Sequence, residues 1–253
     1  MRCSVVMPTY NQAPLLRRTL RSIYAQKPPF DFEVIVVDDG STDETSGVIA
    51  EFPVRFETLP KKIDRRPAMK PSNVGLRMAR GEIIIFQSSD VVHEATDTIQ
   101  RMCNFRPGAF LVASVKSSIA EDGVSCEYWK PGTDRTPNFH GFHVHSIYAR
   151  GPLFYLGSAR RSDIYKIGGF DERFTGFCWN DFWFADCLML GAGLEVIYRD
   201  DIVGHHQQHH FYSATPAWPP PSLIEDSRVM KLFYDKLRAS GVFHTETAPW
   251  PMN

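Results

Sequence analysis

The stretch Val34-Ile-Val-Val-Asp-Asp-Gly-Ser-Thr-Asp43 joins four β-branched residues to an acidic turn. A short continuous apolar run that ends at Asp-Gly is typical of a strand buried on both faces of a parallel sheet. In an open α/β sheet, ligands bind outside the carboxyl ends of the strands. We therefore expect a strand over residues 33–38 that brings Asp38 and Asp39 to a binding edge, although Asp-Gly is also ordinary turn chemistry.

The same alternation of apolar runs with helical spacing fills the first 115 residues and is typical of βαβ units. Similar runs predict strands near residues 3–7, 54–59, 83–87 and 109–115. Asn11 is expected to cap a helix after the first strand, and the capping-box spacing of Ser41 and Glu44 predicts that a second helix begins there. A third helix is expected over residues 73–80, with Gly81 as its stop.

The second half of the chain is less regular, and residues 116–160 are expected to be rich in loops. Beyond them the pattern predicts, in order, a helix over 162–167, a helix over 181–190, a strand over 195–198 and a histidine-rich turn. Consecutive prolines at 219–221 form a stiff spacer. An amphipathic helix over 224–239 closes at Gly241, and the residues leave open whether it docks on the core, pairs with another subunit or touches a membrane.

Composition excludes several classes of protein. With 253 residues, 43% of them apolar, the chain is long enough to form a core. The formal charge of −1 gives no overall reason to expect nucleic acid or an anionic membrane as the main partner. Apolar runs of four or five residues are far too short to span a membrane, and the N-terminus lacks the apolar core of a secretory signal. We expect a cytoplasmic protein whose five cysteines are free thiols.

Polar residues gather where several predicted strands end. These segments are Pro8-Thr9-Tyr10-Asn11, Asp38-Asp39-Gly40-Ser41, Ser88-Ser89-Asp90, Asn180-Asp181 and His205-His206. An aromatic ring and two acidic loops at one edge suit a nucleotide, because tyrosine stacks on a base and a carboxylate accepts a hydrogen bond from a base N–H. A metal-bridged diphosphate would complete such a site.

Four strings in this order resemble the family-2 inverting glycosyltransferases. They are Ser4-Val-Val-Met-Pro-Thr-Tyr-Asn11, Val34 to Asp43, Asn73-Val-Gly75 leading to Ala79-Arg-Gly-Glu82, and Gly168-Gly-Phe-Asp-Glu172, and the similarity spans roughly residues 3–206. The resemblance implies the GT-A fold, an α/β, Rossmann-like, mostly parallel or mixed sheet flanked by helices, here with a C-terminal helical extension. Residues 1–115 would form the nucleotide-sugar-binding half, 116–212 the acceptor-binding and catalytic half, and 213–253 a Pro-rich linker and final helix.

The resemblance also implies roles for individual residues. Asp181 would be the general base, Asp90 and His205 would lie at a Mn²⁺ or Mg²⁺ ion, and Trp179 and Asn180 would contact the acceptor. The nucleotide would be bound by Pro8, Thr9, Tyr10, Asp39, Lys70, Ser88 and Ser89. The implied donor is a UDP- or dTDP-type sugar, and the implied acceptor is a glycan, a lipid-linked sugar or another hydroxyl compound.

Two positions depart from the family pattern. Ser88 stands where an acidic residue usually opens the metal-binding D-x-D, which predicts weaker cation binding. Asn180 stands where glutamate commonly precedes the base, which removes a like charge. Two other functions remain open: a catalytically inactive nucleotide- or sugar-binding module, and a nucleotidyltransferase on a similar fold. No role is assigned to His140, His143 or His145.

Overall fold

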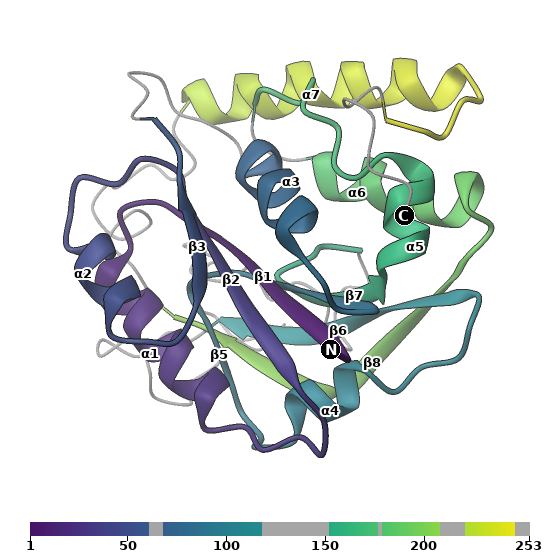
Figure 1. The fold of residues 1–253 in the computed structure, drawn as a ribbon. Coiled ribbons are helices and arrows are strands. Elements are labelled where there is room, and N and C mark those ends of the chain that lie inside the picture. Colours follow the sequence, from purple (N-terminus) through teal and green to yellow (C-terminus); the bar gives the residue numbers. More distant parts are fainter. Residues whose placement is uncertain (61–67, 118–151, 177–178, 208–220, 246–253) are drawn as a thin grey trace, which may run out of the picture.

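The computed structural model describes residues 1–60, 68–117, 152–176, 179–207 and 221–245, which form one mixed eight-stranded sheet with helices on both faces (Figure 1). In chain order the strands are β1 (Cys3–Thr9), β2 (Phe32–Asp38), β3 (Arg55–Thr58), β4 (Ile83–Gln87), β5 (Val91–His93), β6 (Ala109–Ser117), β7 (Leu156–Arg160) and β8 (Glu195–His206). Their order across the sheet is β3-β2-β1-β4-β7-β6-β8-β5. Strands β3, β2, β1 and β4 run parallel, whereas β7 is antiparallel to both of its neighbours.

The helices divide between the two faces of the sheet. One face packs against α1 (Ala13–Tyr24), α2 (Thr45–Ala50) and α4 (Thr98–Met102). The other packs against α3 (Met69–Met78), α5 (Arg161–Ile167), α6 (Asn180–Asp186) with the π-helical turn η1 (Cys187–Gly191), and α7 (Pro221–Ala239). In Figure 1, α7 lies across the top of the molecule above α3 and α6. Among the described helices, none has the length and apolarity needed to cross a bilayer.

Alternate residues of the central strands enter opposite cores. Val5 and Val34 pack on the α1 side of the sheet, while Val6 and Ile35 pack on the α3 side. Burial on both faces explains why the continuous β-branched runs predicted these strands nearly to the residue. The predicted α/β class with a sheet flanked by helices is confirmed, and the sheet continues across the boundary expected at residue 115.

The predicted helix starts at the first two loops were wrong. Asn11 has φ +49° and does not cap α1; instead its Oδ1 accepts a hydrogen bond from the Thr42 N–H at 2.7 Å. Ser41 accepts a hydrogen bond from the Asn11 N–H rather than from α2, which begins only at Thr45. These polar side chains tie two loops together, so the contacts that they make are not local and the sequence spacing does not reveal them.

Predictions in the second half needed larger corrections. Leu156–Arg160, placed within a loop-rich region, forms β7 in the middle of the sheet, and β5 was not predicted. The strand expected over 195–198 continues as β8 to His206, so two of the four histidines of the expected turn lie in a strand. The helix expected over 181–190 is α6 followed by η1. Cys3, Cys103 and Cys187 are free, as predicted, while Cys126, Cys178, His209 and His210 lie outside the described residues.

Gly81 has a different role from the one expected. The third helix spans Met69–Met78 and ends before Gly81, whose backbone lies against β1. A Cβ atom at position 81 would stand 2.4 Å from the Ser4 backbone nitrogen. The glycine is therefore required by the close approach of two backbones rather than by a helix end.

Replacing Gly81 with alanine is expected to lower the free energy of unfolding by about 3 kcal/mol, because overpacking against backbone forces strands β1 and β4 apart. Chemical denaturation measures the change. Gly108→Ala is the control for backbone strain without a clash, since Gly108 has φ +77° and a Cβ atom added there would meet no atom within 4 Å. An equal or smaller loss of stability in Gly81→Ala than in Gly108→Ala would contradict the packing argument.

Candidate active site

The loop after β1 contributes one wall of the candidate site. Pro8 lies within β1, opposite Val37 of β2, and Tyr10 follows the strand with half of its surface exposed. The Thr9 carbonyl accepts a hydrogen bond from the Asp39 N–H at 2.9 Å, which holds the ends of the two strands together. Thr9 Oγ1 is buried without a hydrogen-bond partner among the described residues. This edge therefore has an exposed ring beside a buried polar atom.

Asp38 and Asp39 are both buried at the end of β2 but differ in their contacts. Asp38 Oδ1 accepts a hydrogen bond from the Ser41 N–H at 2.9 Å, so Asp38 has the turn-forming role that the sequence left open. Asp39 follows at the carboxyl end of the strand, next to the loop that carries Tyr10. The structure thus brings the Pro8–Tyr10 and Asp39 segments together at one rim, as predicted.

The loop after β4 is joined to the loop after β1 through Gln12. Ser89 Oγ donates a hydrogen bond to Gln12 Oε1 at 2.5 Å, and Gln12 Nε2 donates one to Asp90 Oδ2 at 3.3 Å. Ser88 Oγ donates to the other oxygen, Asp90 Oδ1, at 2.5 Å. Ser88 therefore orients the Asp90 carboxylate. The sequence interpretation missed Gln12, although its place just beyond the carboxyl end of β1 is the relevant signal.

The histidine beside Asp90 is His206, not His205. His206 Nε2 lies 3.3 Å from Asp90 Oδ2, whereas His205 Nε2 lies 3.0 Å from Glu94 Oε2. Burial by itself lowers the pKa of His206, but the adjacent Asp90 carboxylate brings that pKa above its ordinary value. Burial lowers the pKa of His205, and Glu94 offsets this only in part. The structure thus corrects the predicted position of the histidine by one residue.

A bulge in β8 explains the correction. Ala113 of β6 pairs with Arg199, but the next residue, Ser114, pairs with Val203, so residues 200–202 bulge out. Three inserted residues reverse the alternation of side chains between the faces of a strand. Val196 and Tyr198 pack on the α3 side, whereas Ile202 packs on the α1 side. In a continuous strand, His205 would occupy the face that His206 occupies here.

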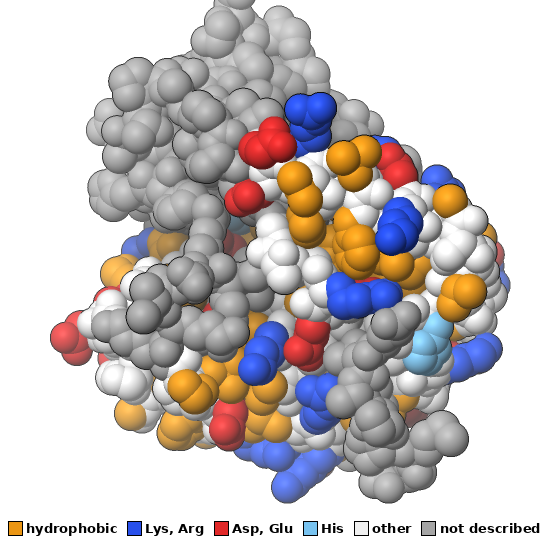
Figure 2. Space-filling model, turned by 90° about the horizontal axis from the view of Figure 1, so that it is seen from above, with side chains coloured by type: hydrophobic (Ala, Val, Ile, Leu, Met, Phe, Trp, Pro, Cys, Tyr) orange, Lys and Arg blue, Asp and Glu red, His pale blue; other side chains and the backbone are white. Residues whose placement is uncertain are grey.

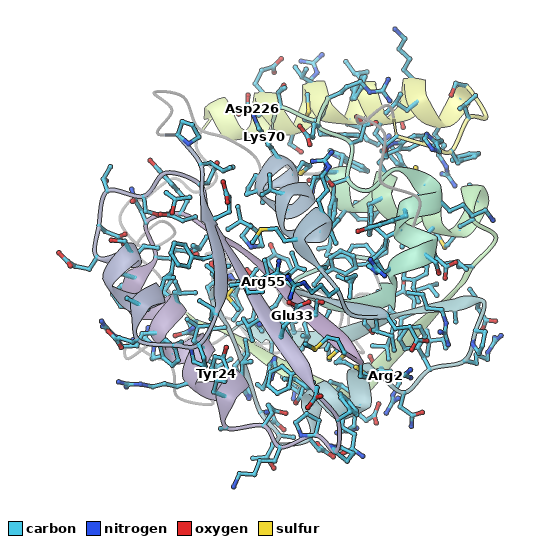
Figure 3. The ribbon with its side chains drawn as sticks, in the orientation of Figure 1. Arg2, Tyr24, Glu33, Arg55, Lys70 and Asp226 are labelled. Atoms are coloured by element: carbon cyan, nitrogen blue, oxygen red, sulfur yellow. The ribbon has the colours of Figure 1, made fainter. Side chains whose placement is uncertain are left out.

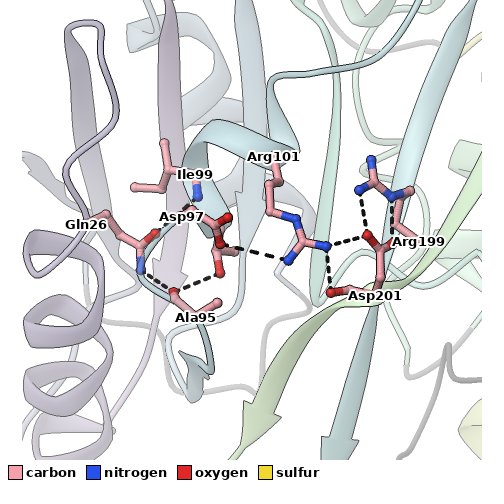
Figure 4. A network of polar contacts seen from close by, with 8 residues as sticks. Gln26, Ala95, Asp97, Ile99, Arg101, Arg199 and Asp201 are labelled. Carbon is pink, nitrogen blue, oxygen red and sulfur yellow. Dashed lines mark hydrogen bonds and ion pairs between the residues drawn. The ribbon is translucent and has the colours of Figure 1, made fainter.

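Polar contacts hold the bulge in place (Figure 4). Arg101 Nη2 donates a hydrogen bond to the Asp201 carbonyl at 2.8 Å and also binds its carboxylate, and Arg199 Nε donates to Asp201 Oδ1 at 2.7 Å. Asp97 lies 3.8 Å from the Arg101 guanidinium. Because α4 and β8 are far apart in sequence, the chain pattern does not reveal this bulge.

Asp181 lies in the first turn of α6 and is linked to the Asp90 loop by two adjacent residues. The Phe154 backbone lies close enough to the Asp181 carboxylate to lower its pKa by hydrogen bonding. The carbonyl of Tyr155 accepts a hydrogen bond from the Ser88 N–H at 2.9 Å, and its ring meets the His206 ring edge-on with 5.7 Å between centroids. Phe154 and Tyr155, which the sequence interpretation missed, therefore join the two predicted acidic residues of the site.

Burial raises the pKa of Asp181 to about 7, and the hydrogen bond from the Phe154 backbone lowers it only in part. Asn180 Nδ2 donates a further hydrogen bond to Asp181 Oδ1 at 3.1 Å. A carboxyl group with such a pKa is suited to accept a proton near neutral pH. The environment of Asp181 is therefore that of a candidate general base.

Two other predicted residues lie at the edges of this region. Lys70 is exposed in the first turn of α3, at the end of the helix nearest α7 in Figure 3. The Trp179 ring packs against α7, with 5.4 Å between its centroid and that of Tyr234. The sequence also has a basic stretch before α3, with Lys61, Lys62, Arg65 and Arg66; these residues and His140, His143 and His145 lie outside the described residues.

Asp90 and His206 are a donor set that fits a divalent cation together with a diphosphate. Carboxylate and imidazole are suitable ligands for Mn²⁺, and Mg²⁺ is commonly held by one or two carboxylates plus substrate phosphates. Among the described residues there is no group of three or more His, Cys, Asp or Glu side chains that would hold a metal by itself. A cation at this site would thus share its coordination with the bound nucleotide.

Comparison with known proteins identifies the family. Residues 4–124 match the model for glycosyl transferase family 2. Validoxylamine A glucosyltransferase of Streptomyces hygroscopicus subsp. jinggangensis is 39% identical over 222 residues, covering 76% of this chain and 51% of that protein. Poly(ribitol-phosphate) beta-N-acetylglucosaminyltransferase TarP of Staphylococcus aureus is 40% identical over 97 residues, covering 36% of this chain and 29% of that protein. The chain thus spans about half or less of the length of these curated relatives.

Two solved structures share the fold. Mannosyltransferase PcManGT from Pyrobaculum calidifontis, in complex with GDP-Man and Mn²⁺, has a TM-score of 0.61 at 23% identity, covering 95% of this chain and 73% of that one. S. aureus TarS 1–349, in complex with UDP-GlcNAc, has a TM-score of 0.61 at 20% identity, covering 92% of this chain and 66% of that one. The mixed sheet flanked by helices is thus the GT-A fold. Together with the family match, it shows that the chain belongs to glycosyl transferase family 2.

Proposed function

We propose that this chain is an inverting glycosyltransferase, which moves a sugar from a nucleotide-diphosphate sugar to an acceptor hydroxyl. The observation that carries this proposal is the link from Asp181 through Phe154 and Tyr155 to Ser88 and His206. It joins a carboxyl group of raised pKa to an acidic loop suited to a cation and a diphosphate. Inversion requires these two functions on opposite sides of the sugar carbon that is transferred.

The donor's base is proposed to lie at the rim formed by Pro8, Thr9, Tyr10 and Asp39. Tyr10 has an exposed ring for stacking, and the buried Asp39 stands at the neighbouring strand end to accept a base N–H. Ser88 and Ser89 follow on the next loop, and Lys70 would add charge near the phosphates. A pyrimidine nucleotide, UDP or dTDP, is the proposed donor type; UDP-GlcNAc and GDP-Man in the two similar structures are also nucleotide-diphosphate sugars.

Asp90 and His206 are proposed to hold Mn²⁺ or Mg²⁺ together with the donor's diphosphate. When bound, such an ion neutralises charge on the departing diphosphate. Ser88 and Gln12 would keep the Asp90 carboxylate in position, since each donates a hydrogen bond to a different carboxylate oxygen. This arrangement offsets the missing acidic residue at position 88 by orientation rather than by charge.

Asp181 is proposed to accept the proton of the acceptor hydroxyl as that oxygen attacks the sugar. With a pKa of about 7, the carboxylate is available at neutral pH and is more basic than an ordinary aspartate. Asn180, which donates a hydrogen bond to Asp181, would help to place it beside the acceptor. The proposed acceptor is a hydroxyl compound, such as a glycan or a lipid-linked sugar.

A screen of nucleotide sugars tests this function. We expect hydrolysis or transfer of a UDP- or dTDP-linked sugar in the presence of Mn²⁺, and at least a tenfold loss when EDTA removes the cation, because the diphosphate then departs with its charge unneutralised. Calorimetry with UDP, with and without Mn²⁺, provides a second measurement. Nucleotide binding that is independent of the cation, with no turnover of any donor, would instead identify an inactive binding module.

A further inference from the structure

Helix α6, which carries Asp181, begins at a residue with unusual backbone geometry. Trp179 immediately precedes the helix and has φ +68°, a left-handed conformation that is unfavourable for a non-glycine residue. Its carbonyl accepts the first helical hydrogen bond, from the Trp183 N–H at 3.0 Å. The direction in which α6 starts, and with it the placement of Asp181, thus depends on contacts that keep Trp179 in this conformation.

Helix α7 supplies polar, cationic and aromatic contacts to the Trp179 ring. The ring Nε1–H donates a hydrogen bond to Ser227 Oγ at 3.3 Å, and the Lys231 ammonium lies 5.0 Å from the ring centroid. Tyr234 packs against the ring from the next turn of α7, and Phe182 packs against it from within α6. Aromatic packing and a cation over an indole are both favourable, and they act against the cost of the backbone conformation at Trp179.

The far end of α6 is attached to the same helix. The Tyr234 hydroxyl donates a hydrogen bond to Asp186 Oδ2 at 2.8 Å, and Arg238 Nε lies 3.3 Å from that oxygen. A helix of only seven residues has little stability of its own. Since α7 holds both Trp179 and Asp186, it fixes α6 at its first and last turns.

We propose that α7 is a positioning element for catalysis and that Trp179 is the positioning residue through which it holds Asp181 beside the acceptor. This inference rests on the proposed function, in which Asp181 is the base. It assigns the Trp179 ring to α7, whereas the sequence had predicted a contact with the acceptor. It also resolves the open choice for the final helix in favour of docking on the core.

The half-buried place of Asp181 gives this proposal a measurable signature. Loosening α6 admits water to the carboxyl group, and its pKa then falls toward the ordinary aspartate value of about 3.9. Burial is the main cause of the raised pKa of Asp181, whereas the two cations of α7 contact other groups: Lys231 lies over the Trp179 ring and Arg238 lies beside Asp186. Solvation of Asp181 is therefore the effect that a pH profile would detect.

The test compares Trp179→Ala, Trp179→Phe and Ser227→Ala with the wild-type chain. Trp179→Ala is expected to lower kcat by about tenfold to 100-fold and to move the acidic limb of the kcat/KM profile at least one pH unit below 7, because the base is solvated. Trp179→Phe should restore most of the activity, since it keeps the aromatic contact. Ser227→Ala should shift the limb in the same direction by less. Hydrogen exchange of the α6 amides should quicken in Trp179→Ala.

Leu232→Ala is the matched control on α7. Leu232 is 64% exposed, and the described surface on this side of the molecule shows apolar side chains interspersed with charged ones (Figure 2). This variant should leave the pH profile and α6 exchange unchanged. UDP binding should be unchanged in all four variants, because the donor rim is built from the ends of β1 and β2 rather than from α6 or α7.

Two results would overturn the proposal. The first is a Trp179→Ala variant in which both the acidic limb of the kcat/KM profile and the hydrogen exchange of the α6 amides match the wild type. The second applies if Trp179→Ala fails to fold, and it is a pH profile of Ser227→Ala that is identical to that of Leu232→Ala. Failure of the proposed function looks different. In that case Asp181→Asn retains turnover, while hydrogen exchange still reports whether Trp179 and α7 hold α6 in place.

Discussion

Replacing Asp181 with asparagine is expected to lower kcat by about 1000-fold, the usual range for the loss of a general base. Asparagine has the same shape, and its amide oxygen can still accept the hydrogen bond that Asn180 donates to this position. The loss would therefore come from the missing proton acceptor rather than from a changed fold. Initial rates with the donor found by the screen, measured from pH 5 to pH 9, provide the measurement.

The pH profile strengthens this prediction. Because burial raises the pKa of Asp181 to about 7, the wild-type kcat/KM should fall tenfold for each pH unit below that value as the base becomes protonated. The small residual activity of Asp181→Asn should lack this limb. The sign follows from the mechanism, since only the carboxylate form accepts a proton.

Asp163→Asn provides a matched control. Burial also raises the pKa of Asp163, which lies in α5. Helix α5 follows Arg160, the last residue of β7, and Arg160 pairs with Ile83, the first residue of β4. Asp163 therefore lies near the amino end of β4, whereas the Ser88–Asp90 loop follows the carboxyl end of the same strand. Activity and UDP affinity should both be retained. Turnover in Asp181→Asn similar to that of Asp163→Asn would contradict the assignment of Asp181 as base.

The sequence predicted best the strands whose side chains are buried on both faces. Strand β4, Ile83–Gln87, was predicted with its observed bounds. Its continuous run of three isoleucines and a phenylalanine is typical of a strand that is buried on both faces. Strand β7 was missed because Leu-Gly-Ser-Ala-Arg has neither β-branched residues nor alternation. Its glycine is needed where a Cβ would stand 2.9 Å from the Phe154 ring, a contact that depends on the tertiary structure.

The candidate site was predictable wherever a residue follows directly from the end of a strand. Asp39 and Asp90 were found by this rule, and Gln12 obeys it as well. Phe154 and Tyr155 stand before the start of β7, a strand that was not predicted. A search for residues that follow predicted strands therefore could not find them. The choice between His205 and His206 depends on the bulge at residues 200–202, which is held by side chains from α4. Long-range polar contacts thus set the limit of prediction here.

The second large effect is expected at the proposed cation site. Asp90→Asn should weaken Mn²⁺-dependent binding of UDP by about 100-fold, because it removes the charge that holds the cation and leaves Ser88 and Gln12 with a neutral partner. His206→Gln should weaken the same binding by at least tenfold. Calorimetry of UDP binding at fixed Mn²⁺ measures both changes, and UDP binding without the cation should be unaffected.

His205→Gln makes this prediction specific to the structure. The two histidines are adjacent and both buried, so composition and burial cannot distinguish them. The bulge directs His206 to Asp90 and His205 to Glu94, and His205→Gln should therefore change Mn²⁺-dependent UDP binding by less than about threefold. A larger effect from His205→Gln than from His206→Gln would mean that β8 continues without reversing its faces, and the cation site would then have to be rebuilt around the other residue.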